Sequence, residues 1–274
     1  MMDDAFYESL LTQLRTEGET AIMVRNLFVL ALIVAAACSV VSAADSINTP
    51  PEGTVSLFNG SDFTNWRVPE GDNGHWRIVD GVIDCDALSE AKGDKCLWTE
   101  KEYGDFVLQL DWRIKETPFI NPNVPIVKPD GTHKLDAEGN EIHISLPDSD
   151  SGIYLRGDSK AQVNIWCWPV GSGEVYGYRM DKSMPPEVRA GVTPKVMADN
   201  NIGEWNTFII TVKDNLLTVV LNDITVIENA LLPDLPERGP IALQHHGGKK
   251  DGVWNSPPAL VQFRNIYIKE LENK

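Results

Sequence analysis

Hydrophobic and polar residues alternate strictly over residues 161–168, AQVNIWCW. Successive side chains of a β-strand point to opposite faces, so this period of two predicts a strand with one face against a core. The small and apolar side chains share one face: Ala161, Val163, Ile165 and Cys167. The other face carries two amides and two indoles: Gln162, Asn164, Trp166 and Trp168. Amides and aromatic plates suit a sugar ring, although a solvent-facing sheet merely covered by aromatics is the alternative.

The same pattern recurs in short segments along the chain. Strands are predicted at 55–58, 75–79, 82–85, 106–114, 153–156, 205–213, 216–221, 224–227, 241–243 and 261–268. Asp80-Gly81 between two of them indicates a hairpin turn. Two long irregular loops are expected at 118–146 and 181–203, and no segment keeps a helical period. Many short strands favour an all-β fold, a two-sheet antiparallel sandwich, with an up-and-down barrel as the alternative.

The N-terminal part is read as a leader that precedes the folded domain. Residues 23–43 have a basic start, an apolar run and small residues at the end, which is typical of a signal peptide. Residues 1–22 are then an upstream extension from a start assigned too early, 44–53 a linker, and 54–272 a single domain. We expect an exported protein, periplasmic or extracellular, without stable membrane insertion. A membrane anchor and a lipoprotein modified at Cys38 are the alternatives.

Charge and cysteines narrow the class of partner. The net charge of −16 argues against a nucleic-acid partner, which would favour a basic patch. No P-loop, dinucleotide turn or zinc pattern is present in the sequence. No cofactor is predicted, and a divalent cation such as calcium stays an open alternative.

A Cys85–Cys96 disulfide is plausible in an exported protein, and Cys167 is expected as a buried thiol.

Seven motifs occur in an order that resembles a known family: LFNGSDFTNWR, DGVI, TEKEYGDFVLQLDWRI, SGIYLRG, GEWNTF, GPIALQHHG and FRNIYIKEL. They resemble the exported 3-keto-disaccharide hydrolase family, also named for 3-keto-glucoside 1,2-lyase and 3-keto-2-hydroxyglucal hydratase. The resemblance spans about residues 54–271. It implies a concanavalin-like or laminarinase-like jelly roll that acts on a glycoside. One departure is Gln162, where many relatives carry a glutamate.

The lack of a carboxylate in 161–168 bears on the reaction. Retaining glycosidases need two carboxylates about 5–5.5 Å apart, so ordinary glycoside hydrolysis becomes the lesser alternative. Cleavage of a 3-keto sugar does not require this pair of carboxylates, because the ketone acidifies the C2 proton. One base, one stabiliser of the enolate and one acid for the departing oxygen then suffice. The sequence therefore favours cleavage of 3-keto-glycosides by elimination and hydration.

Candidate site residues follow from strand parity. The predicted catalytic groups are Glu174, His246 and Arg156. The predicted substrate-binding groups are Gln162, Asn164, Trp166, Trp168, Tyr178 and Gln244. Structural alternatives stay open: Glu174 as a rim ion pair with Arg179, Arg156 as a partner of Asp150, and His246 bonded to a loop carbonyl. His245 has the apolar parity and is assigned a structural role. A non-catalytic carbohydrate-binding module is the main alternative function.

Overall fold

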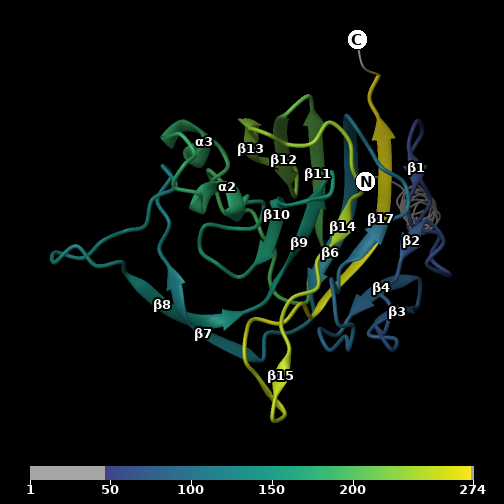
Figure 1. Ribbon diagram of the computed structural model, residues 1–274, viewed down its shortest axis with the longest axis horizontal. Helices are drawn as coiled ribbons and strands as arrows, with labels where there is room; N and C mark the ends of the chain where they lie inside the picture. Colours follow the sequence, from purple (N-terminus) through teal and green to yellow (C-terminus); the bar gives the residue numbers. More distant parts are fainter. Residues whose placement is uncertain (1–46, 273–274) are drawn as a thin grey trace, which may run out of the picture. The chain divides into compact units, whose positions relative to one another are not determined.

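The computed structural model describes residues 47–272. The predicted upstream extension, signal peptide and first part of the linker therefore lie outside the described residues. Within residues 47–272, two antiparallel sheets pack face to face (Figure 1). The predicted all-β jelly-roll sandwich is confirmed. No helix in this range has the length and apolar character needed to cross a membrane.

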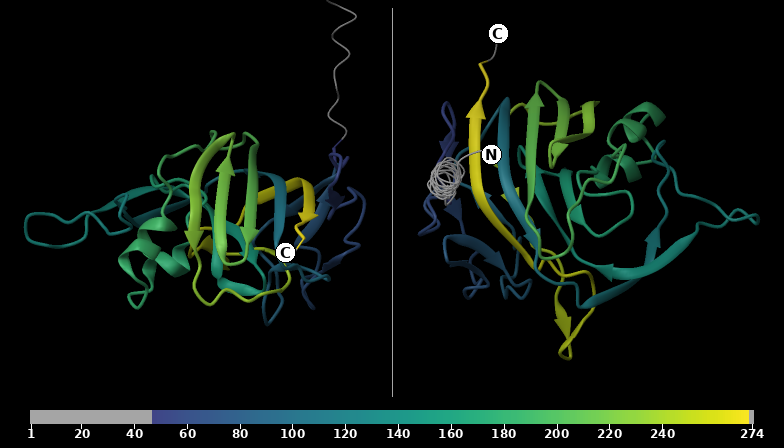
Figure 2. Two further views of the ribbon diagram at one scale, coloured as in Figure 1. Left: turned by 90° about the horizontal axis from the view of Figure 1, so that it is seen from above. Right: turned by 180° about the vertical axis from the view of Figure 1, so that it is seen from behind.

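The larger sheet contains eight strands, in the order β13-β12-β11-β6-β17-β4-β3, with β1 paired to β17. Their bounds are β1 Val55–Ser56, β3 Trp76–Val79, β4 Val82–Cys85, β6 Phe106–Ile114, β11 Asn206–Lys213, β12 Leu216–Leu221, β13 Ile224–Leu231 and β17 Val261–Glu270. The β11–β13 meander is seen side by side in both views of Figure 2. The hairpin predicted at Asp80-Gly81 joins β3 to β4, and both residues have positive φ (51° and 76°), as a type I′ turn requires.

The smaller sheet contains five strands, in the order β10-β9-β14-β5-β2. Their bounds are β2 Trp66–Arg67, β5 Leu97–Thr99, β9 Asp150–Leu155, β10 Asp158–Trp166 and β14 Ala242–Leu243. The strand predicted at 161–168 is β10, which ends two residues early, at Trp166. The side chains of Ala161, Val163 and Ile165 are fully buried in the core, so the predicted parity is correct.

The core lies between the two sheets because each strand turns its apolar positions inward. On β6, the alternate side chains Phe106, Leu108 and Leu110 are at most 1% exposed. Trp112 of the same strand packs against Phe208 of β11, with ring centroids 5.3 Å apart. Apolar burial of this kind is the main stabilising contribution to folding. The outer face of the five-stranded sheet is not part of this core.

The two long loops predicted from the sequence contain more structure than expected. The first is a hairpin of β7 (Phe119–Pro125) and β8 (His143–Asp148), whose 126–142 connection extends away from the sheets in Figure 1. Two short helices, α2 (Tyr176–Met180) and α3 (Pro186–Gly191), lie around the start of the second predicted loop, 181–203. They are too short to show a helical period in the sequence. A small hairpin, β15 (Lys249–Lys250) with β16 (Val253–Trp254), completes the elements.

The predicted Cys85–Cys96 disulfide is wrong. Both thiols are free and buried, and Cys167 is free and half-buried. Cys85 ends β4 in the larger sheet, whereas Cys96 directly precedes β5 in the smaller one. Burial raises the pKa of the Cys96 and Cys167 thiols to about 12, so both stay protonated at neutral pH.

Candidate functional site

One row of side chains crosses the outer face of the five-stranded sheet. The strand register aligns Arg67, Trp98, Ala242, Tyr154 and Gln162 on neighbouring strands from β2 to β10. Residues aligned in this way point to the same side of the sheet. The fully buried Ile153 and Leu243 lie in the adjacent row and point inward. The outer row therefore brings together groups from five strands, between Arg67 of β2 and Ala242 of β14.

Two aromatic rings form the middle of this row. Trp98 and Tyr154 stack with ring centroids 5.8 Å apart and an angle of 26° between the planes. Both side chains are half-buried, so part of each ring faces solvent. The Trp98 indole N–H donates to the Asp94 carboxylate, which fixes the ring. An aromatic surface held in this way can pack against the C–H face of a sugar.

An acid–base pair lies on the same face of the sheet, where Asp150 precedes Tyr154 by four residues on β9. His246 Nε2 is 3.7 Å from Asp150 Oδ2, and the two side chains are 36% and 26% exposed. His246 Nδ1 is 2.6 Å from the Pro257 carbonyl oxygen, which can only accept, so Nδ1 carries a proton. Nε2 is then free to exchange a proton on the Asp150 side.

The pKa of Asp150 suits a group that accepts a proton. Burial raises the pKa of Asp150, His246 lowers it and Asp148 raises it, and the net result is a pKa of about 6. The raised pKa makes Asp150 a better base than an ordinary aspartate while leaving it ionised at neutral pH. Asp148 itself is 1% exposed and accepts hydrogen bonds from Trp168 Nε1 at 3.0 Å and Asn121 Nδ2 at 2.7 Å. The carboxylate of Asp148 is therefore engaged in these hydrogen bonds, and Asp148 is a buried neighbour of Asp150.

The predicted amides lie beneath this surface. Gln162, Asn164 and Gln244 face the outer side, as predicted, but they are only 9%, 3% and 7% exposed. Residues 171–175 fold over the edge of β10, where Asn164 Nδ2 donates to the Glu174 carbonyl oxygen at 3.1 Å. The prediction that Asn164 contacts the sugar is therefore wrong. Gln162 and Gln244 form a supporting layer under Tyr154.

The two indoles of the predicted strand differ in exposure. Trp166 is 5% exposed, and its N–H donates to the Gly171 carbonyl oxygen at 2.8 Å. Trp168 is half-buried and stacks on Trp166 with centroids 4.1 Å apart and planes 5° apart. Tyr176, which is 40% exposed, meets both rings edge-on. Trp166 is thus a support, whereas Trp168 and Tyr176 form a second aromatic edge of the face.

The prediction of Glu174 as a proton-transfer group is wrong, because the side chain is completely buried. It forms an ion pair with Arg179, and both side chains are 0% exposed. Burial raises the pKa of Glu174, and Arg179 opposes the shift. Arg179 Nη1 also lies 2.8 Å from His133 Nε2, which links α2 to the long hairpin connection. Glu174 belongs to this internal network and cannot reach a substrate.

Arg156 and Tyr178 are also structural. Arg156 lies in the β9–β10 turn with φ of 49° and is 3% exposed. Its guanidinium donates to the Asp105 carboxylate at 2.7 Å, so the predicted enolate role is wrong and the alternative pairing with Asp150 is not formed. Tyr178 is 1% exposed and donates its hydroxyl to the Pro233 carbonyl oxygen at 2.9 Å. Strand parity predicts the face of the sheet to which a side chain points, but it does not predict how deeply the side chain is buried.

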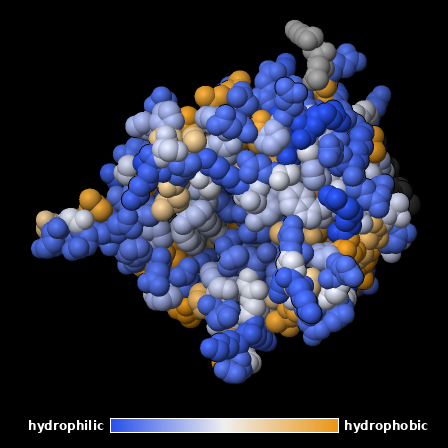
Figure 3. Space-filling model, in the orientation of Figure 1, coloured by the Kyte–Doolittle hydropathy of each residue, from blue (hydrophilic) through white to orange (hydrophobic). Residues whose placement is uncertain are grey.

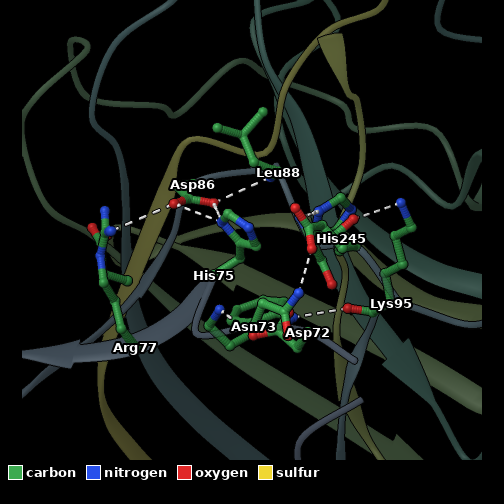
Figure 4. A network of polar contacts seen from close by, with 12 residues as sticks. Asp72, Asn73, His75, Arg77, Asp86, Leu88, Lys95 and His245 are labelled. Atoms are coloured by element: carbon green, nitrogen blue, oxygen red, sulfur yellow. Dashed lines mark hydrogen bonds and ion pairs between the residues drawn. The ribbon is translucent and has the colours of Figure 1, made fainter. Parts of the chain in front are cut away.

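His245 belongs to a separate polar network, shown in Figure 4. Its Nε2 accepts a hydrogen bond from the Ser89 N–H at 3.3 Å, and Lys95 Nζ donates to the Ser89 carbonyl oxygen at 2.8 Å. Burial lowers the pKa of His245 to about 4, so the ring is neutral at pH 7. These contacts give His245 the structural role that its parity predicts.

Four residues of this face were not predicted as site residues: Asp150, Tyr154, Trp98 and Tyr176. Asp150 was considered as an alternative partner of Arg156, not as a proton-transfer group. Asp150 and Tyr154 share the parity of the polar face of their strand, which was a usable signal. Trp98 gave none, because only the pairing of β5 with β14 brings it to Tyr154. Among residues 47–272, no three His, Cys, Asp or Glu side chains gather as metal ligands.

The two antiparallel sheets, packed face to face, define a protein of the jelly-roll class. A family model for the 3-keto-alpha-glucoside-1,2-lyase-like domain matches residues 53–269, and the chain belongs to this family. A proposed glycosyl hydrolase from Parabacteroides distasonis shares 20% identity over 83% of this chain and 100% of its own, with a TM-score of 0.52.

A second proposed glycosyl hydrolase structure from Parabacteroides distasonis shares 22% identity over 81% of this chain and 85% of its own, also with a TM-score of 0.52. At these identities the likeness shows a shared fold. The comparison with curated proteins gives no match. The family resemblance predicted from the seven motifs is therefore confirmed by the family match.

Proposed function

We propose that this protein is an exported enzyme that cleaves 3-keto-glycosides by elimination followed by hydration. The observation that carries the proposal is the solvent-accessible Asp150–His246 pair, 3.7 Å apart, on the same sheet face as the Trp98–Tyr154 stack. The family to which the chain belongs supports the substrate class. The signal-like segment 23–43 supports export. Figure 3 shows one face of the molecule, on which hydrophilic residues predominate, as suits a hydroxylated ligand.

In the first step the C2–H and C1–O bonds break. Asp150 removes the proton at C2, which is acidic because C3 is a ketone, and the electron pair forms the C1–C2 double bond as the aglycone leaves. His246, protonated at Nε2, gives its proton to the departing oxygen. Tyr154 donates a hydrogen bond to the C3 oxygen, where negative charge develops. The products are the free aglycone and a 3-keto-2-hydroxyglycal.

In the second step water adds across the C1–C2 double bond. His246, now neutral at Nε2, takes a proton from water as the oxygen bonds to C1, and Asp150 returns its proton to C2. Both groups regain their starting protonation states, and the net reaction is hydrolysis to the 3-keto sugar. Asp148 is buried and hydrogen-bonded, so it does not serve as the second carboxylate that ordinary retaining hydrolysis requires.

The test is product analysis with purified protein. Incubation with a 3-keto-glucoside should release the aglycone and 3-keto-glucose, with the glycal as a transient product. The matched plain glucoside should stay intact, because its C2 proton is not acidic. Equal cleavage of both substrates would favour an ordinary glycosidase. Binding without cleavage of either would favour the carbohydrate-binding module. Sequencing of the secreted protein, with a start near Ala44 or Asp45, tests export.

A further inference from the structure

A chain of three hydrogen bonds runs beneath the proposed site, from a backbone carbonyl to a phenol. Gln162 Nε2 donates to the Ser151 carbonyl oxygen at 3.1 Å and to Gln244 Oε1 at 2.5 Å. Gln244 Nε2 then donates to the Tyr154 hydroxyl oxygen at 3.0 Å. Gln162 and Gln244 are 9% and 7% exposed, so water competes little for these bonds.

The chemistry of the groups fixes the direction of this chain. The Ser151 carbonyl oxygen can only accept, so the Gln162 amide must turn its nitrogen toward Ser151. The same nitrogen faces Gln244, which must therefore present its oxygen. Gln244 then presents its nitrogen to Tyr154, whose oxygen accepts. The phenol proton of Tyr154 is thereby left free for a different acceptor.

Such an acceptor would have to come from the open side of the sheet. Within the part of the chain that the structure describes, the Tyr154 hydroxyl donates to no protein group. The Tyr154 side chain is half-buried and lies in the outer row between Gln162 and the Trp98 ring. A bound ligand in contact with this row can accept the proton that the protein leaves unused.

Gly152 makes room for the arrangement. An added Cβ at this position would lie 2.5 Å from Gln162 Nε2 and 2.7 Å from the Val163 carbonyl oxygen. The Gln162 side chain therefore lies flat across the neighbouring strand, where it reaches both Ser151 and Gln244. A side chain on Gly152 would displace the first member of the chain of bonds.

We propose that Gln162 is a positioning residue which acts through Gln244 to aim the Tyr154 proton at an acceptor oxygen of the ligand. This inference rests on the proposed function, in which that acceptor is the C3 ketone oxygen and then the enolate. The site consequently selects ligands that accept a hydrogen bond at this point over alcohols that also need to donate one.

A carboxylate at residue 162 would reverse the chain of bonds. Glutamate has about the size of glutamine but only accepts, so Gln244 would turn its nitrogen toward it. The Gln244 oxygen would then face Tyr154, and the phenol would donate inward. The Tyr154 oxygen would meet the substrate ketone with a lone pair, which is repulsive where charge develops.

The test is a double-mutant cycle on a 3-keto-glucoside. Removing one donor to a developing oxyanion costs about 10²–10³-fold in kcat, so Tyr154→Phe should lose about 10²-fold. Gln162→Glu should lose a similar factor, mostly in kcat rather than in KM. In the Tyr154→Phe background, Gln162→Glu should cost less than about threefold, because its effect passes through the missing hydroxyl.

A further loss of about tenfold or more in the Tyr154→Phe background would overturn the inference, as would wild-type turnover by Gln162→Glu. Gln162→Met, which neither donates nor accepts a normal hydrogen bond, separates loss of the relay from its reversal and should lose less than Gln162→Glu. Equal losses in Gln162→Met and Gln162→Glu would count against a reversal.

Neutron diffraction of deuterated crystals tests the relay without any turnover. The wild-type Tyr154 deuterium should point away from Gln244, and the Gln162→Glu deuterium should point toward it. A wild-type deuterium on the Gln244 side would overturn the inference even if 3-keto-glycosides are cleaved. The expected direction in a protein that cleaves nothing would uphold the relay and refute only the proposed function.

Discussion

Replacing Arg179 with methionine should destabilise the fold by an amount that depends on pH. Arg179 and Glu174 are both 0% exposed, so the substitution leaves the Glu174 carboxylate buried without its partner. Breaking a buried pair in this way typically costs about 3–5 kcal/mol. For a domain of this size, such a loss lowers Tm by about 6–20 °C.

The pH dependence follows from the proton that Glu174 can take up. The pKa of Glu174 is raised in the folded state, so stability falls as pH rises above its unfolded value of about 4.3. Holding a proton on such a carboxyl costs about 1.4 kcal/mol per pH unit, or about 1 kcal/mol at pH 5 and 5 kcal/mol at pH 8. Wild type loses stability in the same way until Glu174 ionises at about pH 7, so the loss in Arg179→Met relative to wild type should be about 1.4 kcal/mol larger at pH 8 than at pH 5.

Urea unfolding at pH 5 and pH 8 measures this difference. The control is the double variant Glu174→Leu with Arg179→Met, which removes both charges and keeps the apolar volume. It should be more stable than Arg179→Met at pH 8, and, because it lacks the Glu174 carboxyl, its stability should change less between pH 5 and pH 8 than that of wild type. A loss in Arg179→Met that is equal at pH 5 and pH 8 would refute the argument for a buried carboxylate.

Two further predictions concern the aromatic row and the cysteines. Trp98→Ala should raise KM for a 3-keto-glucoside about tenfold, since stacking is worth about 1–1.5 kcal/mol, with a smaller change in kcat; steady-state kinetics that show an unchanged KM would contradict the platform. Because Cys85 and Cys96 are free thiols, a reductant should leave Tm unchanged and both should be alkylated after denaturation; an intact-protein mass two hydrogens short would contradict this.

The sequence predicted the sheets well because strand periodicity is local. The alternation in β10 placed Gln162 outward and Val163 inward, and the Asp80-Gly81 turn formed as its residues require. The cysteine pairing failed because it depends on which sheet each strand joins. Cys85 and Cys96 are close in sequence, but Cys85 ends β4 of the larger sheet and Cys96 lies just before β5 of the smaller sheet.

The site was predicted only in part, because depth and pairing are tertiary properties. Parity placed Glu174 near β10, but the fold of residues 171–175 over the edge of that strand buries its side chain. His246 was predicted, whereas its partner Asp150 required the pairing of β9 with β14. The unusual Gln162 has a role only through Gln244 and Tyr154, which no local pattern connects.

The pH dependence of kcat/KM for a 3-keto-glucoside, in wild type and Asp150→Asn, tests the central claim most directly. Because the pKa of Asp150 is about 6 and the base must be ionised, wild-type kcat/KM should fall as pH drops through about 6. Asp150→Asn should lose about 10²–10⁴-fold in kcat and lack this acidic limb, while still binding 3-keto-glucose. Wild-type turnover by Asp150→Asn, with the acidic limb retained, would show that Asp150 is not the base.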